Sequence, residues 1–182
     1  KATQILNENF PKSEGYIVKH TVLTSLLTVD ENIWFPFFKE NGDNHFQTSF
    51  DGLMRGKGYM RNWEKKVRAA KEYGLDVGTI SVINQELLKD GPKDTLDYLA
   101  DLGIKEASFL PFMWNEQNDG KAYDKFAPTM DAWSNFMIEL SEYYFQKKNA
   151  GLFTPEIGQM SFILHQQHQP PMANIAGQTL FL

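Results

Sequence analysis

The sequence contains no cysteine among its 182 residues. This absence excludes disulfides, thiolate nucleophiles, and zinc or iron–sulfur sites that depend on cysteine ligands. No apolar run reaches the roughly 18 residues that a helix needs to span a bilayer, and no signal peptide is visible at the start. These absences predict a cytoplasmic protein that does not associate with membranes.

Common catalytic and binding motifs are also lacking. The sequence has no phosphate-binding P-loop, no nucleophile elbow and no dinucleotide fingerprint. Its net charge of −5 disfavours nucleic acid as a partner. His165 and His168 have a spacing that could place two metal ligands on one helix face, but two prolines follow directly and no carboxylate motif accompanies them. We therefore expect no metal site, and a structural or surface role for both histidines.

Four segments have the β-branched and aromatic composition of strands. They are residues 16–23, 45–49, 75–82 and 105–110. The segments begin at intervals of about 30 residues, the length of a βα unit whose helix returns the chain to start a parallel strand. The spacing predicts an α/β fold built from parallel (β/α) units with right-handed crossovers.

Helices are expected between these strands. Trp63, Val67 and Ala70 recur at the spacing of one helix face and predict a helix over about residues 62–73. Three further helices are expected to begin near Asp30, Pro92 and Thr129. Residues 113–128 are expected to form a long polar loop.

The stretch from Asn44 to Arg61 carries the polar residues of greatest interest. In parallel α/β proteins ligands bind at the carboxyl edge of the strands, which is where Ser49, Asp51 and Arg55 are placed. The planar fork of an arginine can bind two oxygens of a carboxylate or phosphate. Two glycines follow this arginine and would let the backbone approach a bound group. The alternative is an ordinary connection between a strand and a helix, with a solvated Arg55.

Several short phrases occur in a recognisable order. They are Ser49-Phe50-Asp51-Gly52, Arg55-Gly56-Lys57-Gly58, Tyr73-Gly74, Val82-Ile83-Asn84 and Leu110-Pro111-Phe112. In order and spacing they resemble the radical S-adenosylmethionine (radical SAM) superfamily, in particular its peptide- and protein-modifying branch with a SPASM-type C-terminal region, such as anaerobic sulfatase-maturating enzymes. The resemblance covers about residues 2–151.

The resemblance implies a partial TIM-type barrel, with about four strands of the family's half barrel, and a pocket for S-adenosylmethionine at the strand ends. Ser49 would bond to the methionine or ribose part of this cofactor, and Arg55 would hold its carboxylate. Leu110 would pack near the adenine. Asn84 would contact the residues that bind the cofactor and not the cofactor itself. Asp51 would form the turn that fixes the loop.

The chain departs from the family at the iron–sulfur site. The family holds a [4Fe–4S] cluster with three cysteines in a C-x3-C-x2-C loop, and such clusters are held by thiolates, so this chain cannot hold one in that way. The family's glycine-rich phrase for the cofactor's amino group is also missing. The chain opens on Lys1 within an expected helix, so we expect a piece that lacks the first two (β/α) units. Residues 1–151 would form the partial barrel, and residues 152–182 would resemble the start of a SPASM-type region.

Two functions are compatible with these features. The first is part of a radical SAM enzyme that modifies a peptide or protein side chain and is inactive without the missing half. The second is a non-catalytic interaction module, whose uncovered sheet edge and apolar faces pair with a complementing chain or a second copy. The sequence assigns no catalytic residue in either case.

Overall fold

The computed structural model describes residues 22–41, 44–113 and 121–161, together with Ile5, Glu8, Asn9 and Gly15. Most of the strand expected over residues 16–23 lies outside the described residues. The same holds for His165, His168 and the rest of residues 162–182, which include most of the expected SPASM-like region. The division of the chain at residues 151 and 152 stays a prediction.

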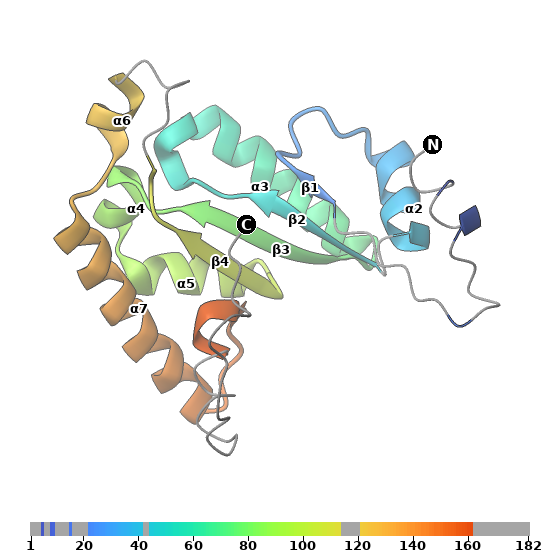
Figure 1. Ribbon diagram of the computed structural model, residues 1–182. Coiled ribbons are helices and arrows are strands. Elements are labelled where there is room, and N and C mark those ends of the chain that lie inside the picture. The colour runs from blue at the N-terminus through green and yellow to red at the C-terminus, as the bar shows by residue number, and fades with distance from the viewer. Residues whose placement is uncertain are drawn as a thin grey trace.

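Five parallel strands form one sheet, in the order in which they occur in the chain (Figure 1). They are β1 (Leu23–Thr24), β2 (His45–Ser49), β3 (Asp76–Val82), β4 (Glu106–Leu110) and β5 (Glu156–Ile157). All four pairings between neighbouring strands are parallel, so each connection carries the chain back along the sheet before the next strand begins. Within the described residues the sheet is open, with β1 and β5 at its edges. The predicted α/β class and partial barrel are confirmed.

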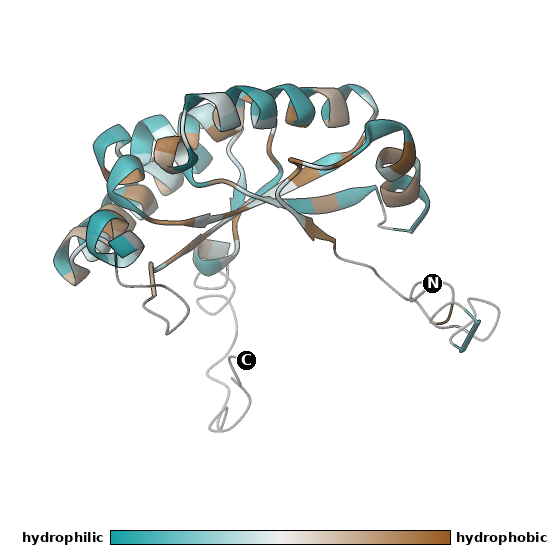
Figure 2. Ribbon diagram, turned by 90° about the horizontal axis from the view of Figure 1, so that it is seen from above, coloured by the Kyte–Doolittle hydropathy of each residue, from teal (hydrophilic) through white to brown (hydrophobic). Residues whose placement is uncertain are grey.

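Helices connect the strands. They are α2 (Glu31–Asn41), α3 (Lys57–Glu72), α4 (Gln85–Asp90), α5 (Pro92–Asp101), α6 (Lys121–Phe126) and α7 (Met130–Asn149), with a 3₁₀ helix, η2 (Gly52–Arg55), between β2 and α3. In the part of the chain that the structure describes, the connecting helices lie on one face of the curved sheet, and none of them lies on its concave face (Figure 2). This is the arrangement of a barrel segment, with helices outside and the strands inside. Among the described helices, none has the length and apolar content to cross a membrane.

The core fills the space between the sheet and these helices. Phe38 of α2 stacks on Phe46 of β2 with ring centres 4.8 Å apart, and both side chains are fully buried. The apolar stripe predicted on the helix after β2 is confirmed, because Trp63, Val67 and Ala70 are all buried. Such close packing of large side chains fixes the distance between α3 and the strands that carry the polar residues.

The connection after β2 is more helical than expected. η2 ends at Arg55, and α3 begins at Lys57, earlier than the expected start near residue 62. Gly56 separates the two helices with a φ of 88°, and its carbonyl accepts a hydrogen bond from the Met60 amide. The second glycine after Arg55, Gly58, lies inside α3 and not in a loop. That the two glycines let the backbone approach a bound group stays a prediction.

Three further elements were not predicted. α4 fills the connection between β3 and α5, and α6 occupies part of residues 113–128, which were expected to form only a loop. Both helices have six residues, too few to show a clear apolar period. β5 has two residues, too few to show the alternation of a strand, and it extends the sheet beyond β4.

A buried hydrogen bond between α3 and β2 provides a test of this packing. The Trp63 indole donates to Thr48 Oγ1 over 3.0 Å, and Thr48 is 0% exposed. Trp63→Phe leaves the Thr48 hydroxyl buried without this partner, so we expect the free energy of unfolding to fall by about 2 kcal/mol. Adding Thr48→Val removes the orphaned hydroxyl and should recover about 1 kcal/mol. Urea denaturation followed by circular dichroism measures both values, and equal stability of the single and double variants would contradict this account.

Candidate functional site

A pocket opens where β2, β3 and β4 end. Val82 and Leu110, the last residues of β3 and β4, are partners in the parallel register. The pocket has a volume of about 410 Å³, within the range of small-molecule sites. Its lining includes Asp51, Arg55, Val82, Leu110 and Phe112.

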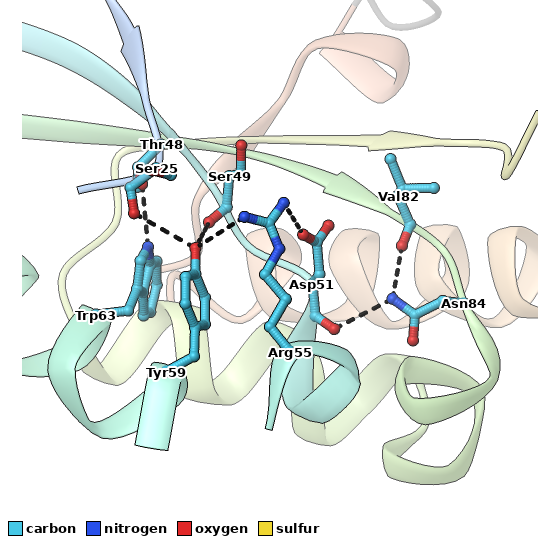
Figure 3. A network of polar contacts seen from close by, with 9 residues as sticks. All are labelled: Ser25, Thr48, Ser49, Asp51, Arg55, Tyr59, Trp63, Val82 and Asn84. Atoms are coloured by element: carbon cyan, nitrogen blue, oxygen red, sulfur yellow. Dashed lines mark hydrogen bonds and ion pairs between the residues drawn. The ribbon is translucent and has the colours of Figure 1, made fainter. Parts of the chain in front are cut away.

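Asp51 and Arg55 form an ion pair in the wall of this pocket (Figure 3). Arg55 Nη2 lies 2.5 Å from Asp51 Oδ2, and the Asp51 side chain is 4% exposed while that of Arg55 is 37% exposed. Among the described residues Asp51 Oδ2 has no aligned hydrogen bond, so the contact is ionic and leaves hydrogen-bonding capacity unused. Because the two charges cancel, the pair suits a ligand that carries both signs of charge better than it suits a polyanion.

Tyr59 of α3 completes this cluster and was not among the predicted site residues. The Arg55 guanidinium lies over the Tyr59 ring, 5.1 Å from its centre. The Tyr59 hydroxyl is 3.4 Å from the carbonyl oxygens of both Ser25 and Ser49, and it can donate to one of them at a time. Burial raises the pKa of Tyr59; Arg55 opposes this shift and Asp51 adds to it, so the hydroxyl stays protonated at neutral pH. The signal that could have identified it is its position four residues after Arg55, close enough for side chains on a helical turn to meet.

Asn84 is fully buried, and its amide is occupied by the protein itself. Its Oδ1 accepts hydrogen bonds from the amides of Glu86 and Leu87, and therefore caps α4. Its Nδ2 donates to the carbonyl oxygens of Asp51 and Val82, over 3.1 and 2.9 Å. Asn84 can therefore affect a ligand only by holding the turn at Asp51 in place.

Ser49 and Leu110 are the last residues of β2 and β4. Ser49 shares a register row with Ile80 and Ser108, so all three side chains point to the same face of the sheet. No described residue forms a hydrogen bond with the Ser49 hydroxyl. Leu110 is 42% exposed and contributes an apolar surface to the pocket.

The structure brings three of the five predicted cofactor residues into one pocket. Asp51, Arg55 and Leu110 line it. Ser49 is near by at the end of β2, where its carbonyl bonds to Tyr59, and Asn84 lies beneath the pocket. A role in cofactor binding stays a prediction for all five.

The residues present fit one of the two groups that the family resemblance implies. A half-exposed guanidinium beside an apolar side chain suits the carboxylate and the adenine of S-adenosylmethionine. An iron–sulfur cluster does not fit, because the chain has no thiolate to hold it. In the part of the chain that the structure describes, no group of three or more histidine and carboxylate side chains could hold a metal ion.

Comparisons with known proteins establish the fold. No family model matches the sequence, and no curated protein matches it. A solved structure described as "Native anSMEcpe with bound AdoMet" aligns with 90% of this chain at a TM-score of 0.67 and 13% identity. The chain spans 46% of the length of that protein. The predicted resemblance to radical SAM enzymes is confirmed at the level of the fold, and the SPASM-type region stays a prediction.

The hydrogen bonds of Asn84 predict a large effect of substitution on stability. Asn84→Ala removes the cap of α4 and two buried bonds to carbonyl oxygens, so the free energy of unfolding should fall by about 3 kcal/mol. Asn84→Ser keeps a capping oxygen and should lose less.

Thr129→Ala is the matched control for this experiment, measured by the same urea denaturation. Thr129 Oγ1 caps α7 through the Ala132 amide alone, at an exposed position, so its loss should cost about 1 kcal/mol. Equal losses in Asn84→Ala and Thr129→Ala would show that the bonds to Asp51 and Val82 add nothing.

Proposed function

We propose that this chain is part of a radical SAM enzyme that modifies a side chain of a peptide or protein. Its own contribution would be one wall of the S-adenosylmethionine pocket. The observation that supports this most directly is the pocket at the strand ends, with Arg55 and Leu110 in its lining. The proposal is also supported by the fold, which this chain shares over 90% of its length with an AdoMet-bound structure.

Each of these residues would contact a different part of the cofactor. Arg55 would hold the carboxylate with the N–H groups that do not face Asp51, while the Tyr59 ring keeps the guanidinium plane in place. Leu110 would cover part of the adenine. Ser49 would offer its hydroxyl to the methionine or ribose part from the end of β2.

The iron–sulfur ligands would come from outside this sequence. S-adenosylmethionine bound beside a reduced [4Fe–4S] cluster supplies radical chemistry, and that cluster needs thiolates which this chain does not contain. The residues described here would therefore bind and orient the cofactor, and a complementing segment or chain would hold the cluster. The concave face of the sheet, on which none of the described connecting helices lies, would admit the peptide or protein substrate (Figure 2).

Binding of S-adenosylmethionine to the full chain tests this proposal. In a ¹H–¹⁵N NMR titration we expect saturable shifts at Leu110 and Phe112, which line the pocket. Arg55→Ala should weaken binding by about 10-fold or more, since a hydrogen bond to a charged group contributes roughly 1.5–3 kcal/mol. Lys57→Ala removes an exposed positive charge two residues away and should leave binding unchanged. Absence of saturable shifts even after a complementing half has been added, or equal losses in both variants, would contradict the proposal.

A second candidate function is a non-catalytic interaction module. It is favoured by the edge of the sheet at β1, near which Leu23, Leu27 and Ile33 are 57%, 46% and 64% exposed. An edge strand with exposed apolar neighbours can pair with a strand of another polypeptide, which would also bury those apolar side chains. The occupant would be a second copy of this chain or a complementing chain.

Self-association measures the second candidate. If a second copy covers this edge, sedimentation velocity should show a concentration-dependent dimer, and Leu23→Lys should weaken dimerisation by about 10-fold or more because it places a charge in an apolar contact. Ile138→Lys is the matched control, because Ile138 is 56% exposed on α7. A monomer at every concentration that binds no apolar dye would exclude this candidate.

A further inference from the structure

Asp51 and Arg55 are the charged residues among the described residues that line the pocket at the strand ends. The rest of this lining is apolar and consists of Met54, Val82, Leu110, Pro111, Phe112 and Met113. Charges act more strongly in such surroundings, because apolar side chains screen them less than water does. The affinity of the pocket for a ligand therefore depends on the charge that the ligand brings to Arg55.

A second ion pair with the same spacing shows what is unusual about Arg55. Within α3, Arg68 pairs with Glu64, which lies four residues earlier, as Arg55 pairs with Asp51. Arg68 donates through both Nε and Nη2 to Glu64 Oε1, over 3.0 and 2.7 Å. Arg55 makes no such aligned hydrogen bond to Asp51 Oδ2, although its Nη2 lies 2.5 Å away. Its guanidinium is held by charge, so most of its N–H donors stay available to a ligand.

Asp51 acts on a ligand through its charge and through Arg55. Its side chain is 4% exposed, so it offers a ligand almost no surface to contact. The turn that carries it is fixed, because Asn84 Nδ2 donates to its carbonyl oxygen. A carboxylate at Arg55 brings one negative charge close to this buried anion, whereas a phosphate monoester brings about two at neutral pH. The repulsion is larger for the phosphate, and an ammonium group beside a carboxylate offsets it.

Tyr59 limits where the Arg55 guanidinium can lie (Figure 3). The guanidinium lies over the Tyr59 ring, 5.1 Å from its centre, and Arg55 Nη1 is 3.5 Å from the Tyr59 hydroxyl. That hydroxyl is in turn 3.4 Å from the carbonyl oxygens of Ser25 and Ser49, just after β1 and at the end of β2. Arg55 is therefore placed between a buried anion and a ring that is anchored to the sheet. A side chain held in this way loses little freedom on binding and cannot turn to follow a larger anion.

We propose that Asp51 and Tyr59 determine the ligand specificity of this pocket. They hold Arg55 so that it binds one carboxylate with an ammonium group beside it, and they disfavour a phosphate group in the same place. Both act through Arg55, so they are positioning residues that need not touch the ligand. This specificity rests on the proposed function, because S-adenosylmethionine carries such a carboxylate, whereas adenosine 5′-monophosphate (AMP) joins the same adenosine to a phosphate.

The relative affinity for S-adenosylmethionine and AMP tests this specificity, by NMR titration of the full chain under the conditions in which S-adenosylmethionine binds. The unsubstituted chain should bind S-adenosylmethionine about tenfold more tightly than AMP, or better. Asp51→Asn keeps the shape of the side chain and removes its charge, so AMP should bind more tightly and the two affinities should become about tenfold closer. A merely structural defect would weaken both ligands and leave their ratio unchanged.

Glu64→Gln is the matched control, because it makes the same chemical change in the other pair and lies outside the pocket. It should leave the ratio of the two affinities as it is. Tighter binding of AMP than of S-adenosylmethionine to the unsubstituted chain would overturn the proposal. An unchanged ratio in Asp51→Asn, or an equal change in Glu64→Gln, would do the same.

Tyr59→Leu tests the positioning role, first without a ligand. ¹⁵N relaxation of the Arg55 Nε–H group should show an ordered side chain in the unsubstituted chain and in Tyr59→Phe, which keeps the ring, and a mobile one in Tyr59→Leu. Tyr73→Leu is the matched control, since Lys39 lies 5.3 Å from the centre of the Tyr73 ring and neither residue lines the pocket. It should leave Arg55 ordered. Equal mobility of Arg55 in the unsubstituted chain and in Tyr59→Leu would overturn this role.

A ligand that lacks the carboxylate separates positioning from structural support. Tyr59→Leu should weaken binding of S-adenosylmethionine by about threefold or more, since Arg55 is no longer held for the carboxylate. Decarboxylated S-adenosylmethionine should bind equally well to Tyr59→Leu and to the unsubstituted chain. Equal losses for both ligands would assign Tyr59 a structural role only and would overturn the proposal.

The outcomes distinguish this specificity from the proposed function. If S-adenosylmethionine binds and Arg55→Ala weakens its binding, while Asp51→Asn leaves the ratio to AMP unchanged, the specificity fails and the proposed function stands. If S-adenosylmethionine does not bind even with the complementing half present, the proposed function fails and the ligand named here fails with it.

Discussion

Parallel pairing of β2, β3 and β4 is the constraint on which the site depends. It brings the carboxyl ends of three strands to one edge, where connections leave the sheet and ligands bind in α/β proteins. Asp51 and Leu110 are far apart in the sequence, and they line one pocket because the strands that precede them run in the same direction. An antiparallel partner would have carried one of these residues to the opposite edge of the sheet.

Two side chains convert this alignment of strands into a fixed arrangement of loops. Asn84 joins the turn at Asp51 to the end of β3, and Tyr59 reaches the carbonyl oxygens at the ends of β1 and β2. Both are anchored on helices behind the sheet and bond to backbone atoms. The charge of Arg55 can then face the pocket, because the backbone beneath it is held by residues that do not themselves need to contact a ligand.

The features that could be predicted from the sequence are those with local determinants. The strand composition of residues 45–49, the stripe of Trp63, Val67 and Ala70, and the cap at Thr129 each depend on residues a few positions apart. α4 and β5 could not be predicted, because their formation depends on packing against distant elements. The site shows the same division: strand-end position identified Asn84, but only the tertiary structure shows that its amide serves α4 and the Asp51 turn. The stacking of Tyr59 under Arg55 likewise required η2 and α3 to be placed.

η2 forms part of the wall of the pocket, and it packs against α4 at Gly52. The φ of Gly52 is 58°, a conformation that favours glycine, and a Cβ built on this residue would lie 2.8 Å from Leu87 Cδ2, so the buried Leu87 side chain would have to shift to admit it. η2 is therefore clamped between α4 and the Asp51 turn that Asn84 holds. The position of Arg55 in the pocket wall therefore depends on the packing of η2 against Leu87 and on the hydrogen bond from Asn84.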